Sequence, residues 1–123
     1  MVEDEPELSE ILLRMIDSFG LEGQHAKSAR TALEKIREFR FDVLLIDLTL
    51  PDKPGIQLYR EIQEKNPVYL GKVIFTSGFE KSDELEQIIE QDNQYFLPKP
   101  FDLEDLREIL AELTGSKALA NRS

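Results

Sequence analysis

The sequence predicts an α/β domain built around a mainly parallel β-sheet. Short apolar runs of strand length alternate with amphipathic segments of helical length along the 123 residues, and this alternation is typical of βα units. Residues 41–46 (FDVLLI) form a mostly apolar run, as expected of a strand that a parallel sheet buries on both faces. A chain of this length buries a sufficient core without disulfide or metal staples, so we expect one domain.

The first part of the chain predicts a helix, a weak strand, a second helix and a buried strand. In residues 6–19 apolar side chains recur every three or four positions, with proline in the first turn and glycine just after the last, which indicates an amphipathic helix. Residues 21–26 (LEGQHA) predict only a weak strand, because β-branched residues are missing and a glycine interrupts the run. Residues 28–40 predict a helix with a serine N-cap, and the buried strand at 41–46 follows.

The remaining elements continue the alternation. They are, in order, a helix at 55–65, a buried strand at 72–76 (KVIFT), a helix that begins at Ser82 or Asp83, a short strand at 95–97 and a final helix that Asp102 caps. Gly115 ends that last helix. We therefore expect a domain over residues 1–114 and a tail or linker over residues 115–123.

The composition excludes several classes of site. The chain has no cysteine and one histidine, His25, so disulfides, thiolate zinc sites, cysteine nucleophiles and histidine-rich metal centres are excluded. The net charge of −10 is spread along the chain, which argues against direct nucleic-acid binding and suits a divalent cation or a positively charged partner. No apolar run approaches the roughly 18 residues of a membrane span, and the acidic start is unlike a signal peptide. We expect a cytoplasmic protein without membrane contact.

Polar side chains stand where the predicted strands end. Asp47, Ser77 and Lys99 each follow a strand, and the pair Glu3 and Asp4 precedes the first helix. Each has an ordinary explanation by itself as a loop, turn or helix-start residue. Because the carboxyl ends of parallel strands meet at one edge of a sheet, however, we expect the whole set to converge there.

The convergent groups suit the transfer of a phosphoryl group onto Asp47. Three neighbouring carboxylates resist ionising together unless a cation joins them, and oxygen ligands without cysteine or histidine favour Mg²⁺. The cation and Lys99 would neutralise charge on the phosphoryl oxygens, and Ser77 would donate a hydrogen bond to them.

Four motifs carry a resemblance to a known family. They are the acidic pair in VEDEP, then LLIDLTLPDKPG with proline four and glycine eight residues after Asp47, then VIFTSG, and finally FLPKPF. The intervals of thirty residues from Asp47 to Ser77 and twenty-two from Ser77 to Lys99 match as well. Over residues 2–113 the chain resembles a response regulator receiver domain of two-component signalling. The resemblance implies a flavodoxin-like doubly wound parallel sheet with strand order 2-1-3-4-5.

The resemblance also implies a metal site and a phosphorylation site. Asp47 would be the phosphoacceptor and a Mg²⁺ ligand. Asp4 would bind the cation directly, Glu3 would act through water, and the backbone carbonyl of Thr49 would be a further ligand.

A second group of residues would respond to the phosphoryl group. Ser77 and Lys99 would hold its oxygens, and Phe96 falls at the aromatic position that rotates inward together with Ser77. The family usually has a cis peptide bond at the position of Lys99–Pro100.

The chain departs from the family at its start. Receiver domains have a complete hydrophobic strand before the acidic pair, whereas only Met1 and Val2 precede Glu3 here. That strand normally lies between those expected at 21–26 and 41–46, so we expect the weak strand to have no neighbour. We expect a chain trimmed at its start to be unstable by itself.

The implied function is that of a signalling phosphoacceptor, which assists its own phosphorylation and dephosphorylation and is not otherwise an enzyme. The expected donor is a histidine kinase or a histidine phosphotransfer domain, and a dimer with a second copy is also considered. A second departure, IIEQDNQYF in place of the usual alanine-glycine step, together with VYLGKVIFTSGF, resembles receivers fused behind hybrid sensor histidine kinases.

Two other functions are weighed against this one. A degenerate receiver that serves only as a protein-binding module remains open because of the shortened first strand. An aspartyl-phosphate hydrolase is disfavoured, since those enzymes have an acid two residues after the nucleophile, whereas Leu48 and Thr49 follow Asp47 here. His25 is expected at a surface or sheet edge, not as a phosphodonor.

Overall fold

The computed structural model describes residues 1–115; the rest of the predicted tail, residues 116–123, lies outside the described residues. The elements are α1 (Pro6–Ser18), α2 (Ala29–Glu38), β1 (Leu44–Asp47), α3 (Gly55–Lys65), the 3-10 helix η1 (Pro67–Tyr69), β2 (Val73–Ser77), α4 (Asp83–Asp92), β3 (Tyr95–Pro98) and α5 (Leu103–Thr114). None of the helices in this part of the chain has the length and apolar character needed to cross a bilayer.

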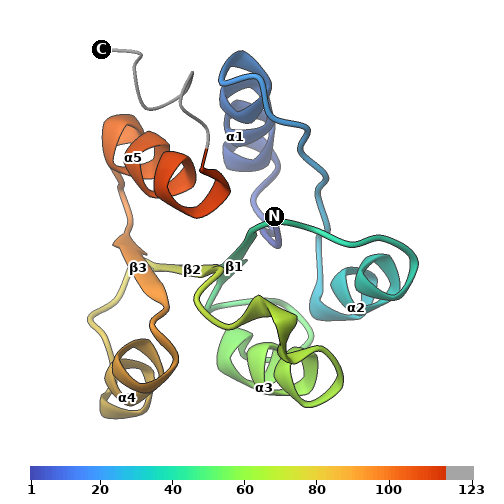
Figure 1. Ribbon diagram of the computed structural model, residues 1–123, viewed down its shortest axis with the longest axis vertical. Coiled ribbons are helices and arrows are strands. Elements are labelled where there is room, and N and C mark those ends of the chain that lie inside the picture. The colour runs from blue at the N-terminus through green and yellow to red at the C-terminus, as the bar shows by residue number, and fades with distance from the viewer. Residues whose placement is uncertain (116–123) are drawn as a thin grey trace.

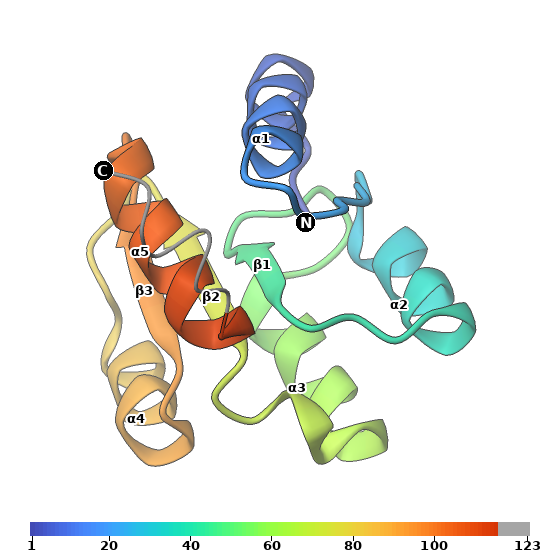
Figure 2. The same cartoon turned by 45° about the horizontal axis from the view of Figure 1, so that its top comes forward.

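Helices cover both faces of a central parallel sheet. α1 and α5 lie on one face, and α2, α3 and α4 lie on the other (Figures 1 and 2). Alternate strand residues enter the two cores: Leu45 and Ile74 pack with α1 and α5, whereas Ile46 and Phe75 pack with the other helices. Both faces therefore bury apolar side chains, which explains the continuous apolar runs of the strands. The doubly wound arrangement is confirmed.

The sheet brings the ends of its strands to one edge. β1, β2 and β3 are adjacent in that order and parallel. The register places Asp47 beside Thr76 and Ser77 beside Pro98. The residues that end the strands therefore lie next to one another, as the sequence predicted.

The amino terminus takes the place of the short first strand. Val2 forms parallel bridges with both Ala26 and Ile46. Its N–H donates to the carbonyl of Leu45 at 2.7 Å, and its carbonyl accepts from the N–H of Asp47 at 3.0 Å. The expectation that the weak strand has no neighbour is therefore wrong, because one residue joins Ala26 to β1. The predicted order 2-1-3-4-5 is kept: the bridge residues Ala26 and Val2 stand in the positions of its strands 2 and 1, and β1, β2 and β3 stand in the positions of its strands 3, 4 and 5.

The weak strand and one strand boundary differ from the prediction. Of residues 21–26, only Ala26 forms a β-bridge, although the Gln24 carbonyl also accepts from the amino group of Met1 at 2.9 Å. This reduced pairing fits the lack of β-branched residues. The run at 41–46 becomes β1 only from Leu44 onward. Phe41 lies outside the ladder, where its N–H donates to the hydroxyl of Tyr69 at 3.2 Å.

The helices follow the predicted apolar stripes and caps. α3 has the predicted bounds. The predicted N-caps Ser28 and Asp102 accept backbone N–H groups through their side chains at the starts of α2 and α5. Of the two residues predicted to begin α4, Ser82 is the N-cap and Asp83 is the first helical residue. Gly115 ends α5 with a φ of 66°, a left-handed conformation that favours glycine.

A cap that was not predicted ties the loop after β1 to α2. The carboxylate of Asp52 accepts the N–H groups of Arg30 and Ala29, both at 2.9 Å. These hydrogen bonds lower the pKa of Asp52. The loop that follows Asp47 is therefore fixed at a helix N-terminus, where an anion is favoured.

Lengthening the first strand should stabilise the chain. A groove of about 410 Å³ beside Met1 is lined by apolar side chains such as Leu21, Val43 and Leu106, together with polar ones such as Arg40 and Asp42. Five or six apolar residues added before Met1 would extend the ladder that Val2 begins and fill this groove. We expect the unfolding midpoint to rise by roughly 5 °C or more in thermal melts. A glycine-serine extension of equal length is the control, and equal midpoints for the two extensions would contradict the prediction.

Candidate functional site

Asp47 is the last residue of β1, and its side chain is held at the carboxyl edge of the sheet. Asp47 as a whole is only 4% exposed. One carboxylate oxygen, Oδ1, accepts the N–H of Thr49 at 3.0 Å, and the other, Oδ2, accepts from Lys99 Nζ at 3.0 Å. Neighbouring strands and the following loop thus fix the orientation of the carboxylate.

The Lys99 side chain bonds two distant parts of the chain, Glu3 and Asp47, at this edge of the sheet. Lys99 follows β3 directly, and its backbone N–H donates to the carbonyl of Ser77 at 2.8 Å. Its Nζ lies 2.8 Å from Glu3 Oε2 and 3.0 Å from Asp47 Oδ2. Burial lowers the pKa of Lys99, but the hydrogen bonds to Glu3 and Asp47 outweigh burial and raise this pKa above its ordinary value. The lysine is therefore held as a cation between two carboxylates.

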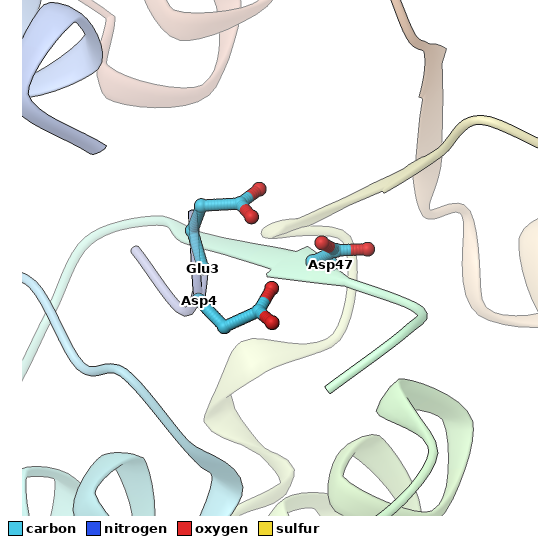
Figure 3. Close-up of side chains that lie close together, drawn as sticks. All are labelled: Glu3, Asp4 and Asp47. Atoms are coloured by element: carbon cyan, nitrogen blue, oxygen red, sulfur yellow. The ribbon is translucent and has the colours of Figure 1, made fainter. Parts of the chain in front are cut away.

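Glu3 and Asp4 complete an acidic cluster with Asp47. Figure 3 shows the three carboxylates turned toward one another, two from the amino-terminal segment and one from the end of β1. One oxygen from each lies within 4.8 Å of the others. Glu3 is only 2% exposed, whereas Asp4 is exposed. Burial raises the pKa of Glu3, and the hydrogen bond from Lys99 opposes that rise.

The cluster fits a hard divalent cation such as Mg²⁺. Three ionised carboxylates and the Lys99 ammonium carry a formal charge of −2, which one divalent cation neutralises. All donors are oxygens at the spacing of a shared ion, and Mg²⁺ prefers such ligands. Thr49 lies beside the cluster through its N–H bond to Asp47, while the role of its carbonyl as a ligand stays a prediction.

Ser77 and Phe96 face a cavity next to this cluster. The cavity is about 510 Å³, and its lining includes Ser77, Phe96 and Lys99. The Ser77 hydroxyl accepts the N–H of Phe79 at 3.0 Å, so its own hydrogen remains available for another acceptor. Phe96 is half-buried in β3, and Lys81 Nζ lies 5.7 Å from the centre of its ring. The residues predicted to hold and sense a phosphoryl group thus line one space.

Some contacts of the site were not predicted. Glu5 Oε1 lies 3.9 Å from Lys99 Nζ, and the ring of His25 contacts the carbonyl of Glu3. His25 does lie in the edge segment, residues 21–26, but it is half-buried and its ring contacts the Glu3 carbonyl. No sequence pattern indicates that Glu5 contacts Lys99 or that His25 contacts Glu3, because the fold brings these distant residues together. The Lys99–Pro100 peptide bond is cis, as the resemblance implied.

The comparisons with known proteins agree with this geometry. The family model for the response regulator receiver domain matches residues 1–111. Response regulator protein PilR of Pseudomonas aeruginosa is 32% identical over 111 residues, which cover 90% of this chain and 24% of that protein. Sensor kinase CckA of Brucella abortus is 32% identical over 116 residues, which cover 92% of this chain and 12% of the kinase. The chain therefore spans a quarter or less of these two relatives.

Solved structures show the same fold. A response regulator receiver domain protein from Clostridium thermocellum has a TM-score of 0.81 at 23% identity and covers 97% of this chain and 94% of its own. The receiver domain of a sensor histidine kinase from Pseudomonas aeruginosa, solved with a magnesium ion in its active site cleft, has a TM-score of 0.79 at 26% identity, with 94% of each chain covered. Because the family model spans 111 residues of the 123 and the fold agrees, the chain belongs to the response regulator receiver domain family.

Proposed function

We propose that this domain accepts a phosphoryl group on Asp47 in a Mg²⁺-dependent reaction and changes its surface as a result. The observation that carries the proposal is the placement of Lys99 Nζ between Asp47 and Glu3, at 3.0 and 2.8 Å. A fixed cation beside a rigid carboxylate is suited to charge that develops on transferring oxygens. Glu3 and Asp4, which lie beside Asp47, would supply further ligands for a divalent cation in addition to the Lys99 ammonium.

The reaction exchanges one phosphorus bond for another. A carboxylate oxygen of Asp47 attacks the phosphorus atom while the bond from phosphorus to the donor breaks, at nitrogen for phosphohistidine or at oxygen for acetyl phosphate. The electron pair of the broken bond leaves with the donor, and Asp47 becomes an acyl phosphate. Lys99 and the Ser77 hydroxyl would stabilise the phosphoryl oxygens.

Glu3, Asp4 and Asp47 would hold the Mg²⁺, with the Thr49 carbonyl as a further ligand. When bound, the cation neutralises negative charge that would otherwise repel an incoming phosphoryl group. Its presence also offsets the cost of keeping Glu3 and Asp47 buried and ionised together.

The signal would leave the site through Ser77 and Phe96. A phosphoryl oxygen offers the Ser77 hydroxyl a strong acceptor, and drawing Ser77 inward opens room for the Phe96 ring. The ring lines the same cavity as Ser77, and Lys81 stands over it. The surface formed by α4 and β3 would change with this rotation.

The partner would be a protein that carries a phosphohistidine, either a histidine kinase or a histidine phosphotransfer domain. The similarity to sensor kinases and to response regulators supports this class of partner and leaves a hybrid kinase among the full-length arrangements. The reaction would occur in the cytoplasm. The domain would assist its own phosphorylation and dephosphorylation without acting on a separate substrate.

A degenerate receiver that only binds proteins is the second candidate, and the reduced first strand is the observation that favours it. Labelling with acetyl phosphate and Mg²⁺ separates the two. A binding module with a non-reactive Asp47 would take up no phosphoryl group, whereas the proposed phosphoacceptor takes up one.

Lys99→Ala should leave the domain folded but slow its phosphorylation by about a hundredfold, the typical cost of losing one preorganised donor to a developing oxyanion. The rate of labelling by acetyl phosphate would be followed by intact mass spectrometry, and folding by circular dichroism. Lys65→Ala, which removes an exposed lysine at the far end of α3, is the matched control. A Lys99→Ala variant that is labelled at the wild-type rate would show that Lys99 has no part in the transfer.

A further inference from the structure

His25 makes a short contact with the backbone that carries the acidic pair. Its ring nitrogen Nε2 lies 2.6 Å from the carbonyl oxygen of Glu3 and 2.9 Å from the hydroxyl oxygen of Ser9. Ser9 is buried in α1, and His25 is half-buried beside it. The imidazole therefore joins three segments of the chain directly beneath the site: the amino terminus, the edge segment and α1.

The direction of these hydrogen bonds follows from the groups present. A carbonyl oxygen can only accept, so Nε2 must carry a hydrogen and donate it to Glu3. The Ser9 hydroxyl has a better-placed acceptor in the Glu5 carbonyl, at 2.8 Å, than in the Glu3 carbonyl, at 3.4 Å. With its hydrogen directed to Glu5, the Ser9 oxygen is free to accept a share of the His25 N–H.

A side chain is needed here because the backbone ladder ends at this point. The N–H of Glu3 donates to the carbonyl of Ala26 at 3.0 Å, which is the last backbone–backbone hydrogen bond between these two segments. Beyond Ala26 the chain turns away into α2, where Ser28 is the N-cap. The imidazole N–H thus takes the place of the backbone donor that a longer strand would have supplied to the Glu3 carbonyl.

That carbonyl belongs to the peptide unit between Glu3 and Asp4. The Glu3 side chain is held by Lys99 and by the N–H of Glu5, whereas Asp4 is exposed and depends on its backbone for its position. Fixing this peptide unit sets the direction in which Asp4 leaves the chain toward Asp47.

We propose that His25 is a positioning residue for the divalent-cation site, which orients the Glu3–Asp4 peptide through its Nε2–H and thereby raises the affinity of the acidic cluster for Mg²⁺. The inference rests on the proposed cation site. Groups that orient metal ligands from behind typically change metal affinity by tenfold or more when they are removed.

His25→Leu keeps a side chain of similar size without the donor, and His25→Gln places an amide N–H close to the position of Nε2. We expect the dissociation constant for Mg²⁺, measured by isothermal titration calorimetry, to rise about tenfold in the leucine variant and to stay within about twofold of wild type in the glutamine variant. Gln24→Leu is the control, because Gln24 precedes His25 in the same segment but its side-chain oxygen accepts from Lys35 Nζ of α2, at 3.5 Å. Loss of this side chain should leave Mg²⁺ affinity unchanged.

A second measurement on the wild-type protein does not depend on how the variants fold. In ¹⁵N-edited NMR spectra the His25 Nε2 should carry the proton, and its signal should shift with the amides of Glu3 and Asp4 along one Mg²⁺ titration curve. A protonated Nδ1 alone, or a ring signal unmoved by Mg²⁺, would overturn the inference.

The outcomes separate this inference from the proposed function. Equal Mg²⁺ affinity in the leucine variant and wild type would leave a purely structural role for His25 and would overturn the inference, while the cation site would stand. Failure of the wild-type domain to bind Mg²⁺ would overturn both. Loss of Mg²⁺ affinity in the leucine variant with recovery in the glutamine variant would support the positioning role of His25. Only the glutamine side chain restores an N–H donor, and a general loss of stability would not produce this difference.

Discussion

Asp47→Asn is expected to take up no phosphoryl group from acetyl phosphate, whereas the wild-type domain takes up one. The amide of asparagine is not nucleophilic and cannot form an acyl phosphate. The change is nearly isosteric, but the single amide oxygen can replace only one of the two acceptors that serve Thr49 and Lys99. The fold should persist, because the backbone hydrogen bonds that hold this position, from the N–H of Asp47 to Val2 and from the N–H of Leu48 to Thr76, are unchanged. Intact mass spectrometry after incubation with acetyl phosphate and Mg²⁺ measures the result.

The matched control for this variant is Asp42→Asn, which neutralises an exposed carboxylate just before β1. That variant should be labelled at the wild-type rate. Chelating the divalent cation should abolish labelling of the wild-type protein as well, since three neighbouring carboxylates then repel the donor. Persistent labelling of Asp47→Asn would show that another residue accepts the phosphoryl group.

Gly55→Ala is expected to destabilise the domain by about 2–3 kcal/mol through overpacking and to slow phosphorylation. Gly55 begins α3 and is buried against the end of β1, where its N–H donates to the Leu48 carbonyl at 2.8 Å. A β-carbon at this position would lie 2.4 Å from the Asp47 carbonyl oxygen and 2.7 Å from the Leu48 α-carbon. Both are backbone atoms, so either α3 or the end of β1 must move.

Gly78→Ala is the control for this steric argument. Gly78 follows β2 at the same edge of the sheet, and a β-carbon there would meet nothing within 4 Å. Urea unfolding of both variants gives the free energies, and acetyl phosphate labelling gives the rates. If Gly55→Ala unfolds at the same urea concentration as Gly78→Ala, the close contact between α3 and β1 does not constrain the site.

The sequence predicted elements well where local signals coincided. The caps at Ser28 and Ser82 were found because an apolar stripe at helical spacing begins at a residue whose side chain can accept N–H bonds. α3 was found from its apolar stripe alone, since its N-cap, Pro54, makes no side-chain cap. β2 and β3 were found because apolar runs of strand length lie between turn residues. Such signals lie within a few neighbouring residues and do not depend on the rest of the fold.

The failures are positions where a distant partner decides the structure. Val2 could not be expected to join Ala26 to β1 from a pattern of two residues. Asp52 caps a helix that begins 23 residues earlier, and no local motif indicates that pairing. These contacts depend on tertiary packing, which local propensity does not encode.

The candidate site was predictable in its members but not in its detailed contacts. Parallel strands bring their carboxyl ends together, so Asp47, Ser77 and Lys99 were expected at one edge. The structure adds that Lys99 Nζ bonds Glu3 as well as Asp47 across 96 positions of sequence. It also adds that the His25 ring contacts the Glu3 carbonyl, a contact that the isolated histidine in a weak strand did not indicate.

Locating the phosphoryl group itself tests most directly whether Asp47 is the phosphoacceptor. The wild-type domain would be incubated with acetyl phosphate and Mg²⁺, the acyl phosphate reduced with borohydride to homoserine, and the peptides mapped by mass spectrometry. We predict conversion of a single residue, Asp47, and none when the divalent cation is chelated. Conversion of a different carboxylate, or an unmodified Asp47 in protein that binds Mg²⁺, would contradict the proposed phosphoacceptor role.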